Sequence, residues 1–82
     1  MSNILQFIKL YQNEKNVDVL TMITLSIEKF YYDLCIANKN YIDTYFFNYR
    51  KILKQINEMK KFNLNEKNTF IIVKDILINE KK

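Results

Sequence analysis

NYIDTYFFNYRKILKQINEMKKF, residues 40–62, decides the fold, because it is the longest uninterrupted run of helical periodicity in the chain. At 100° per residue its apolar side chains fall on one side of a helix. That stripe consists of Ile42, Tyr45, Tyr49, Ile52, Ile56 and Met59. The opposite side carries charge, namely Asp43, Arg50, Lys51, Lys54, Glu58 and Lys61. Phe47 breaks the pattern, because it points into the charged face.

The whole chain has the size and composition of one helical domain, residues 1–82. Its hydrophobic fraction of 49% is enough for a packed core, and it contains neither Gly nor Pro. Tight turns with positive φ and β-hairpins depend on Gly. The composition therefore favours helices that are joined by short links rich in Asn and Lys.

The region before this stretch predicts two helices, over residues 3–13 and 17–37. The first has Ser2 or Asn3 as its cap, and Asn16 caps the second. The apolar stripe of the first helix is Ile4, Phe7, Ile8 and Tyr11. The principal stripe of the second helix is Leu20, Ile23, Ile27, Phe30, Tyr31 and Leu34. Its opposite side is also apolar, with Met22, Leu25, Tyr32 and Ile36. Such a helix is either central in its bundle or presents a second face to a partner, and we favour the central position.

After the third helix, predicted over residues 41–61 with Asn40 as its cap, a polar link leads to a fourth helix over residues 66–80. Phe62 and Leu64 are expected to anchor this link under the bundle, and Asn65 to cap the last helix. Residues 69–73 are rich in β-formers, which makes a strand the competing interpretation. The spacing of the apolar residues favours a helix with a buried side. That side consists of Phe70, Ile72, Val73, Ile76 and Leu77.

These four helices predict an all-α fold, an antiparallel up-down-up-down four-helix bundle. The link at residues 38–40 is short enough to require antiparallel packing of the second and third helices. No internal repeat or linker divides the chain, so the bundle uses all of it.

The residue inventory argues against catalysis, cofactors and metals. The chain has no His, the most common general base and zinc ligand, and a single Cys, Cys35. Without Gly it has neither a P-loop nor a dinucleotide-binding fingerprint. Its carboxylates are better explained as solvated helix ends than as an acid–base pair. We therefore expect a protein that is not an enzyme and that uses no cofactor.

Location is also constrained by the sequence. No window reaches 18 apolar residues, so no membrane span is expected, and the N-terminus lacks the pattern of a secretory signal. The lone Cys35 suits a reducing compartment. The expectation is a soluble cytoplasmic protein.

Positive charge is concentrated in the second half of the chain. Residues 1–41 carry four Lys and four acids, whereas residues 42–82 carry nine basic groups and five acids, which gives the net charge of +4. Such an excess favours nucleic acid, an anionic membrane or an acidic protein, or serves solubility alone. A DNA-reading helix needs basic or amide groups near its N-terminus, and Glu66-Lys67-Asn68-Thr69 offers only two beside an acid. Nucleic-acid binding is therefore the weaker interpretation.

Protein binding is the stronger one. Phe47, Ile71 and Ile78 fall outside the core stripes and lie beside cations, and exposed apolar groups rimmed by charge mark interaction sites. The alternative is that these are ordinary surface residues, or that the helical phase has drifted. The candidate partner-binding set is Phe47, Arg50, Lys51, Lys54, Lys61, Ile71, Lys74 and Ile78.

Residues 46–77, FFNYRKILKQINEMKKFNLNEKNTFIIVKDIL, are similar to the C-terminal half of the immunity proteins for pediocin-like (class IIa) bacteriocins. In that family a Tyr-containing segment, here residues 45–51, begins a long helix. An apolar-Asn-apolar link follows, here Phe62-Asn63-Leu64, and leads into a last helix, here residues 69–77. Residues 17–27 look like the family's second helix.

The resemblance implies an antiparallel four-helix bundle that protects a bacteriocin producer from its own peptide. It implies a cytoplasmic protein that acts at the inner face of the membrane. There it would recognise a mannose phosphotransferase receptor that holds the bacteriocin, and block the pore without turnover. The alternative function is a small helical regulator of phage or plasmid type that binds nucleic acid or another protein. Either protein could form a homodimer through the second apolar face of the second helix.

Overall fold

Four α-helices and one 3₁₀ turn make up the computed structural model, which describes residues 2–62 and 66–80. The elements are α1 (Ser2–Glu14), α2 (Val17–Ala37), η1 (Lys39–Tyr41), α3 (Ile42–Phe62) and α4 (Glu66–Asn79). No strand occurs in these two described ranges, so the all-α four-helix prediction is confirmed. The helix predicted over residues 17–37 coincides with α2, and the other predicted ends fall within one residue of the observed ones.

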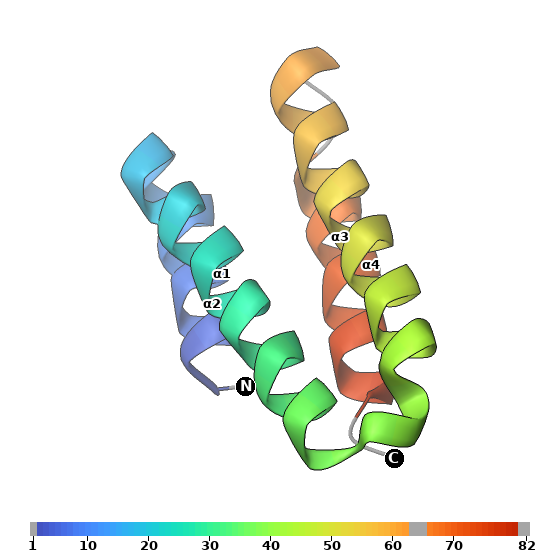
Figure 1. Cartoon of the computed structure of the whole chain (residues 1–82). Helices are drawn as coiled ribbons and strands as arrows, with labels where there is room; N and C mark the ends of the chain where they lie inside the picture. The colour runs from blue at the N-terminus through green and yellow to red at the C-terminus, as the bar shows by residue number, and fades with distance from the viewer. Residues whose placement is uncertain (1, 63–65, 81–82) are drawn as a thin grey trace.

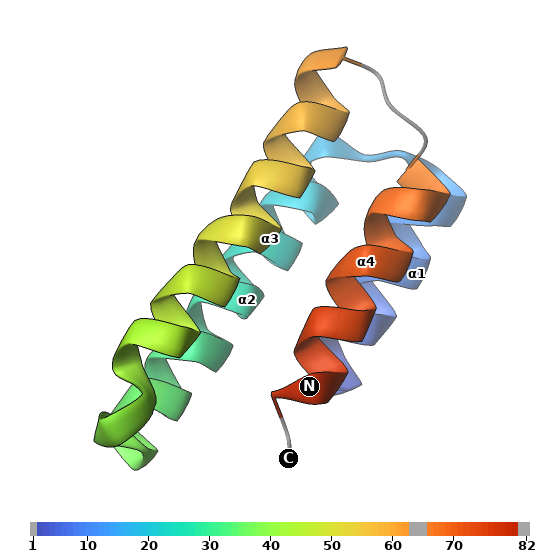
Figure 2. The same ribbon diagram turned by 90° about the vertical axis from the view of Figure 1, so that its right-hand side faces the viewer.

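The helices form a ring in which each one contacts two neighbours. α1 packs against α2, α2 against α3, α3 against α4, and α4 against α1. Figure 1 shows the pairs α1–α2 and α3–α4 side by side, with the colour ramp ascending α1 and α3 and descending α2 and α4. Seen from the side in Figure 2, α4 lies next to α1. The core occupies the space between the four helices.

That core is made of aliphatic and aromatic side chains from every helix. It comprises Ile4, Ile8, Val19, Leu20, Ile23, Ile27, Tyr31, Tyr45, Ile52, Ile56, Met59, Phe70, Val73 and Leu77. All of these except Val19 belong to the apolar stripes that the sequence predicts. Burying large aliphatic side chains contributes about 1.5–3 kcal/mol each, which explains why the stripes locate the core so well.

Two residues of the predicted apolar stripes are exposed, Ile42 and Ile72. Ile42 precedes Tyr49 and Ile56 by seven and fourteen residues, and each heptad step rotates a straight helix by about 20°. The stripe therefore drifts from the fully buried Ile56 through the half-buried Tyr49 to the exposed Ile42. Ile72 lies 100° from Val73, which is enough to carry it past the edge of the buried side of α4.

The central position predicted for the second helix is wrong. Met22, Leu25, Tyr32 and Ile36 are all exposed. Among the four α-helices of the described ranges, α2 contacts only α1 and α3. Its outer side therefore has no neighbour to cover it, and the alternative of a second apolar face remains.

The connections differ from the prediction in two places. Phe62 is exposed rather than tucked under the bundle, whereas the expected anchor Leu64 and the expected cap Asn65 lie outside the described residues. Asn40 is not a cap, because it lies inside η1. The Asn38 carbonyl accepts the Tyr41 N–H at 3.0 Å, so the turn that leads into α3 is closed by backbone groups. At the start of α2 the prediction is confirmed, because the Asn16 side chain accepts the Asp18 N–H at 2.8 Å.

Candidate partner-binding surface

The outer face of α3 is the centre of the candidate site. Phe47 is 67% exposed, which confirms the position inferred from its break in the helical pattern. The ring cannot turn inward, because the buried Tyr45 and Ile52 occupy the opposite side of the same helix. Phe47 is thus an aromatic side chain that the fold leaves in contact with solvent.

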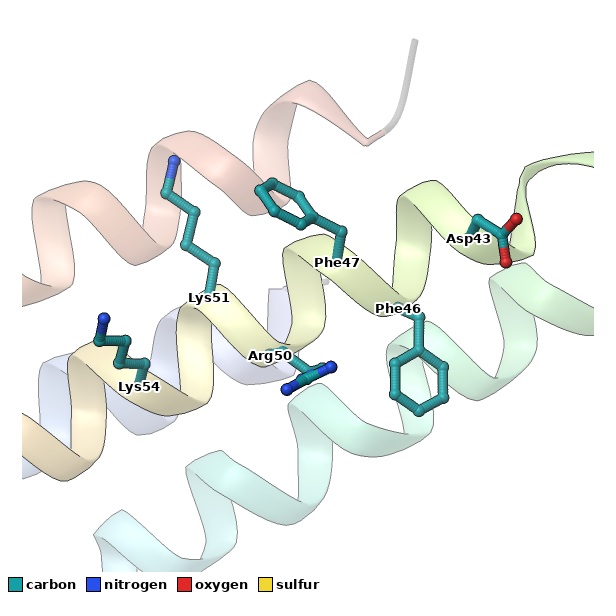
Figure 3. Close-up of a pocket in the computed structure, with 6 residues that line it drawn as sticks. All are labelled: Asp43, Phe46, Phe47, Arg50, Lys51 and Lys54. Atoms are coloured by element: carbon teal, nitrogen blue, oxygen red, sulfur yellow. The ribbon is translucent and has the colours of Figure 1, made fainter.

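A shallow depression surrounds this ring. It is lined by Asp43, Phe46, Phe47, Arg50, Lys51 and Lys54, all of which belong to α3. Figure 3 shows that Phe47 and Lys51 project from one flank of the helix and Phe46 and Arg50 from the other. A depression built on one helix is too open to enclose a small molecule, since ligand pockets are concave and bury most of their ligand. The arrangement suits a macromolecular partner instead.

The basic part of the surface continues toward the end of α3. Arg50 and Lys54 also line a second depression, together with Leu53, Asn57, Glu58, Lys61 and Phe62. Lys61 Nζ lies 5.4 Å above the centroid of the Phe62 ring. The structure therefore brings together five predicted site residues, Phe47, Arg50, Lys51, Lys54 and Lys61. We call these five the α3 surface.

The three predicted residues on α4 are not part of this surface. Ile71 and Ile78 are exposed as expected, whereas Lys74 is half-buried. None of the three lines either depression on α3. Ile71, Lys74 and Ile78 therefore form a separate patch on another helix.

The sequence analysis missed an apolar groove between α2 and α3. The groove has a volume of about 210 Å³ and is lined by Glu28, Tyr31, Tyr32, Cys35, Tyr45, Phe46 and Tyr49. Phe46 is also exposed, although less than its neighbour Phe47, and it lies on the flank that faces α2. A signal was present, because Phe46 lies 100° from Tyr45 around the helix and so belongs to neither the buried stripe nor the charged face.

Hydrogen bonds tie the flanks of α3 to its two neighbours. The Tyr49 hydroxyl donates to Glu28 Oε2 at 3.3 Å, across to α2. Burial and the charge of Glu28 raise the pKa of Tyr49. On the other flank, Asn48 Nδ2 donates to Glu80 Oε1 at 3.1 Å. These bonds fix the rotation of α3 about its axis and thus hold Phe47 outward.

A buried polar pair lies where α2, α3 and the end of α4 meet. The hydroxyl of Tyr31 and Oε2 of Glu80 are both buried, and neither has a hydrogen-bond partner among the described residues. Burial, followed by the nearby Glu80 carboxylate, raises the pKa of Tyr31 far above its ordinary value of 10.0. The phenol is therefore neutral at physiological pH, and it is enclosed in the core rather than presented to a substrate.

The described residues contain no group of three or more His, Cys, Asp or Glu side chains that could hold a metal ion. Over the same residues, no helix has the length and hydropathy that a membrane crossing requires. In comparisons with known proteins, no family model, no curated protein and no solved structure matches this chain.

Proposed function

We propose that this protein acts by binding another protein through the α3 surface, and that it is a bacteriocin immunity protein of the class IIa type. The observation that supports binding is the exposed ring of Phe47 among Arg50, Lys51 and Lys54. Aromatic and Arg side chains are enriched among residues that dominate binding energy. Exposing a phenylalanine costs a protein favourable burial, so a fold that retains it on a charged face has a reason to do so.

The resemblance of residues 46–77 to the immunity family supplies the identity of the partner in this proposal. The partner is the mannose phosphotransferase receptor with its bound bacteriocin, which the protein reaches from the cytoplasm. The cations of the α3 surface favour an acidic region on that partner, because complementary charge accelerates encounter and fixes orientation. Binding is stoichiometric and involves no chemical step.

Protection of living cells tests this proposal. The chain is expressed in bacteriocin-sensitive cells, which are then challenged with a panel of class IIa peptides. We expect at least one peptide to be tolerated at a higher concentration than in cells with an empty vector. Equal sensitivity to every peptide, with the protein detected in the cells, would contradict the immunity function.

The role of the surface is tested in the same cells with matched substitutions. Phe47→Ala should lower protection, and so should the double change Lys51→Glu and Lys54→Glu. Val17→Ala is the control, since Val17 is 65% exposed at the start of α2, away from the α3 surface. If Phe47→Ala protects as well as Val17→Ala does, the α3 surface is not the contact.

The alternative of a nucleic-acid regulator gains no support from the N-terminus of α4. Thr69 is buried, and Glu66 pairs with Lys15 of the α1–α2 link. Glu66 and Thr69 are thus engaged within the bundle. The regulator interpretation predicts DNA binding that weakens steeply with salt, and the absence of a mobility shift at low salt would exclude it.

A further inference from the structure

The face formed jointly by α2 and α3 carries a second exposed apolar surface. On α2 it contains Leu25, Tyr32 and Ile36, and on α3 it contains Ile42 and Phe46. These five side chains are between 40% and 64% exposed. Contiguous apolar patches of more than a few hundred Å² are rare on monomers and mark interaction sites. We call these five residues, with Glu28, Arg50 and Leu53, the α2–α3 face.

Helical spacing places these residues on one side of the molecule. Tyr32 and Phe46 line the same groove, which shows that both point to the seam between the two helices. Glu28 and Ile36 lie four residues on either side of Tyr32, and Leu25 lies seven residues before it, so they share its side of α2. Ile42 and Arg50 lie four residues on either side of Phe46, and Figure 3 shows Arg50 on the same flank as Phe46.

Contacts across the seam fix which residues lie at the same height. The hydrogen bond from Tyr49 places Glu28 level with Tyr49 and Arg50, and the shared groove places Tyr32 level with Phe46. Residue numbers rise along α2 as they fall along α3. Ile36 lies one helical turn after Tyr32 on α2, and Ile42 lies one turn before Phe46 on α3. These two residues are therefore also at the same height.

Leu25 lies about one turn before Glu28, and Leu53 lies about one turn after Arg50, so these two residues are at the same height as well. The α2–α3 face thus consists of four pairs of residues, each at one height along the helices. Three pairs are apolar. The fourth, which we call the charged level, pairs the acid Glu28 on α2 with the base Arg50 on α3.

We propose that a second copy of this chain covers the α2–α3 face, with the two-fold axis parallel to the helices and running between α2 and α3. This rotation lays α2 of one copy on α3 of the other and keeps every residue at its own height. Tyr32 then meets Phe46 of the second copy, and Glu28 meets Arg50 of the second copy. The charged level becomes two salt bridges, and the three apolar levels pack against each other.

Charge complementarity favours a second copy over an unrelated occupant. Neither Glu28 nor Arg50 forms an ion pair within the described residues. An isologous interface must be complementary to itself. One acid and one base at equal heights on adjacent helices meet that requirement, because the two-fold rotation exchanges them.

The exposed apolar area supplies a large part of what a dimer needs. The five exposed apolar side chains offer on the order of 500 Å² per copy, compared with roughly 800 Å² that each partner buries in a standard interface. Aromatic side chains are enriched in such interfaces, and this face contains the exposed Tyr32 and Phe46. In the dimer Phe47 and Lys51 stay outside, because they project from the opposite flank of α3. The inference therefore does not depend on the proposed immunity function. The dimer would display two copies of Phe47 and Lys51, whereas Arg50 of the α3 surface would be covered by the second copy.

Sedimentation equilibrium of the whole chain with a charge swap tests the dimer and its geometry. The wild type should dimerise, and Glu28→Arg or Arg50→Glu alone should each weaken association about ten-fold or more, because each places like charges together. The double variant E28R/R50E restores opposite charges and should return the dissociation constant to within about three-fold of the wild type. Lys51→Glu makes the same charge change as Arg50→Glu on the other flank, and should leave association unchanged.

Circular dichroism of each variant shows whether the bundle is intact, so that lost association is not confused with unfolding. A wild type that stays monomeric at about 1 mM, where interfaces of this size associate, would overturn the dimer. Single variants that dimerise normally, or a double variant that fails to recover while folded, would overturn the arrangement of α2 on α3.

Discussion

Tyr31 is the residue at which packing and titration are most closely linked. Its ring contacts Phe30, Tyr45 and Tyr49, with centroid distances of 5.4, 6.4 and 5.8 Å. Its hydroxyl is buried without a hydrogen-bond partner among the described residues. An unsatisfied buried polar group costs about 1–3 kcal/mol. The ring therefore stabilises the core, whereas the hydroxyl adds little to that stability.

We predict that Tyr31→Phe leaves the free energy of unfolding at pH 7 unchanged or raises it by up to about 1 kcal/mol. It should also reduce the loss of stability at alkaline pH. The pKa of Tyr31 is raised in the folded state, so below the unfolded value of about 10 the phenol is protonated in both states. Above that pH the unfolded chain ionises first, and stability falls by up to about 1.4 kcal/mol per pH unit.

Urea denaturation between pH 8 and about 11 measures this effect. The wild type should lose stability more steeply than Tyr31→Phe does above pH ~10. Tyr41→Phe, at an exposed tyrosine, is the control and should follow the wild-type curve. Identical curves for the wild type and Tyr31→Phe would show that Tyr31 ionises freely in the fold.

One exposed and one buried phenylalanine offer a direct comparison of what burial contributes to stability. Phe47→Ala should cost less than about 1 kcal/mol, because the ring is exposed. Phe70→Ala should cost about 3–5 kcal/mol, since its ring is 1% exposed and packs edge-on against Tyr11 at 5.8 Å. Chemical denaturation of both variants gives the two values. A loss of 3 kcal/mol or more for Phe47→Ala would place that ring in the core.

At the scale of elements, the connection between α1 and α2 shows how this chain turns without glycine. The Lys15 N–H donates to the Tyr11 carbonyl at 2.7 Å, which closes the end of α1. Lys15 has φ of 56°, the left-handed region that glycine usually occupies. Asn16 follows with an extended backbone and caps α2 through its side chain. Two residues therefore end one helix and start the next.

We predict that Asn16→Ala destabilises the protein by about 1 kcal/mol, the usual cost of losing an N-cap. Thermal denaturation followed by circular dichroism should show a melting temperature lower by about 4–8 °C. Asn13→Ala makes the same chemical change in the last turn of α1, where alanine is a better helix former. It should be neutral or slightly stabilising, and an equal loss at both positions would contradict the capping role.

The helices could be predicted from sequence because their apolar periodicity is the same property that buries them. The backbone conformation of the links between helices was harder to predict from the sequence. Asn40 has the chemistry of a cap, but the chain forms η1 before it starts α3, and the carbonyl of Asn38 satisfies Tyr41. That choice depends on where α2 ends relative to α3, which is a tertiary constraint that no window of sequence contains.

At the scale of the whole molecule, periodicity locates the core but does not say how many neighbours each helix has. The outer apolar residues of α2, such as Leu25 and Tyr32, are compatible with a central helix until the ring of four is known. The α3 surface could be predicted, since Phe47 is an apolar residue on the charged face of its helix. For the groove beside Phe46 the sequence holds only the intermediate position of Phe46 on its helix, because the groove itself exists only where α2 and α3 meet.

The ring of four helices leaves the α2–α3 face uncovered, and this gives the dimer a thermodynamic signature. If association accompanies folding, a hundred-fold rise in protein concentration should raise the melting temperature by about 5–10 °C, by mass action on a chain of this size. Differential scanning calorimetry at two concentrations measures the shift. Arg50→Glu, which removes the cross-copy ion pair, should need at least about ten-fold more protein than the wild type to reach the same melting temperature, whereas Lys51→Glu should behave like the wild type. A wild-type melting temperature that does not depend on concentration would mean that the bundle owes none of its stability to a second copy.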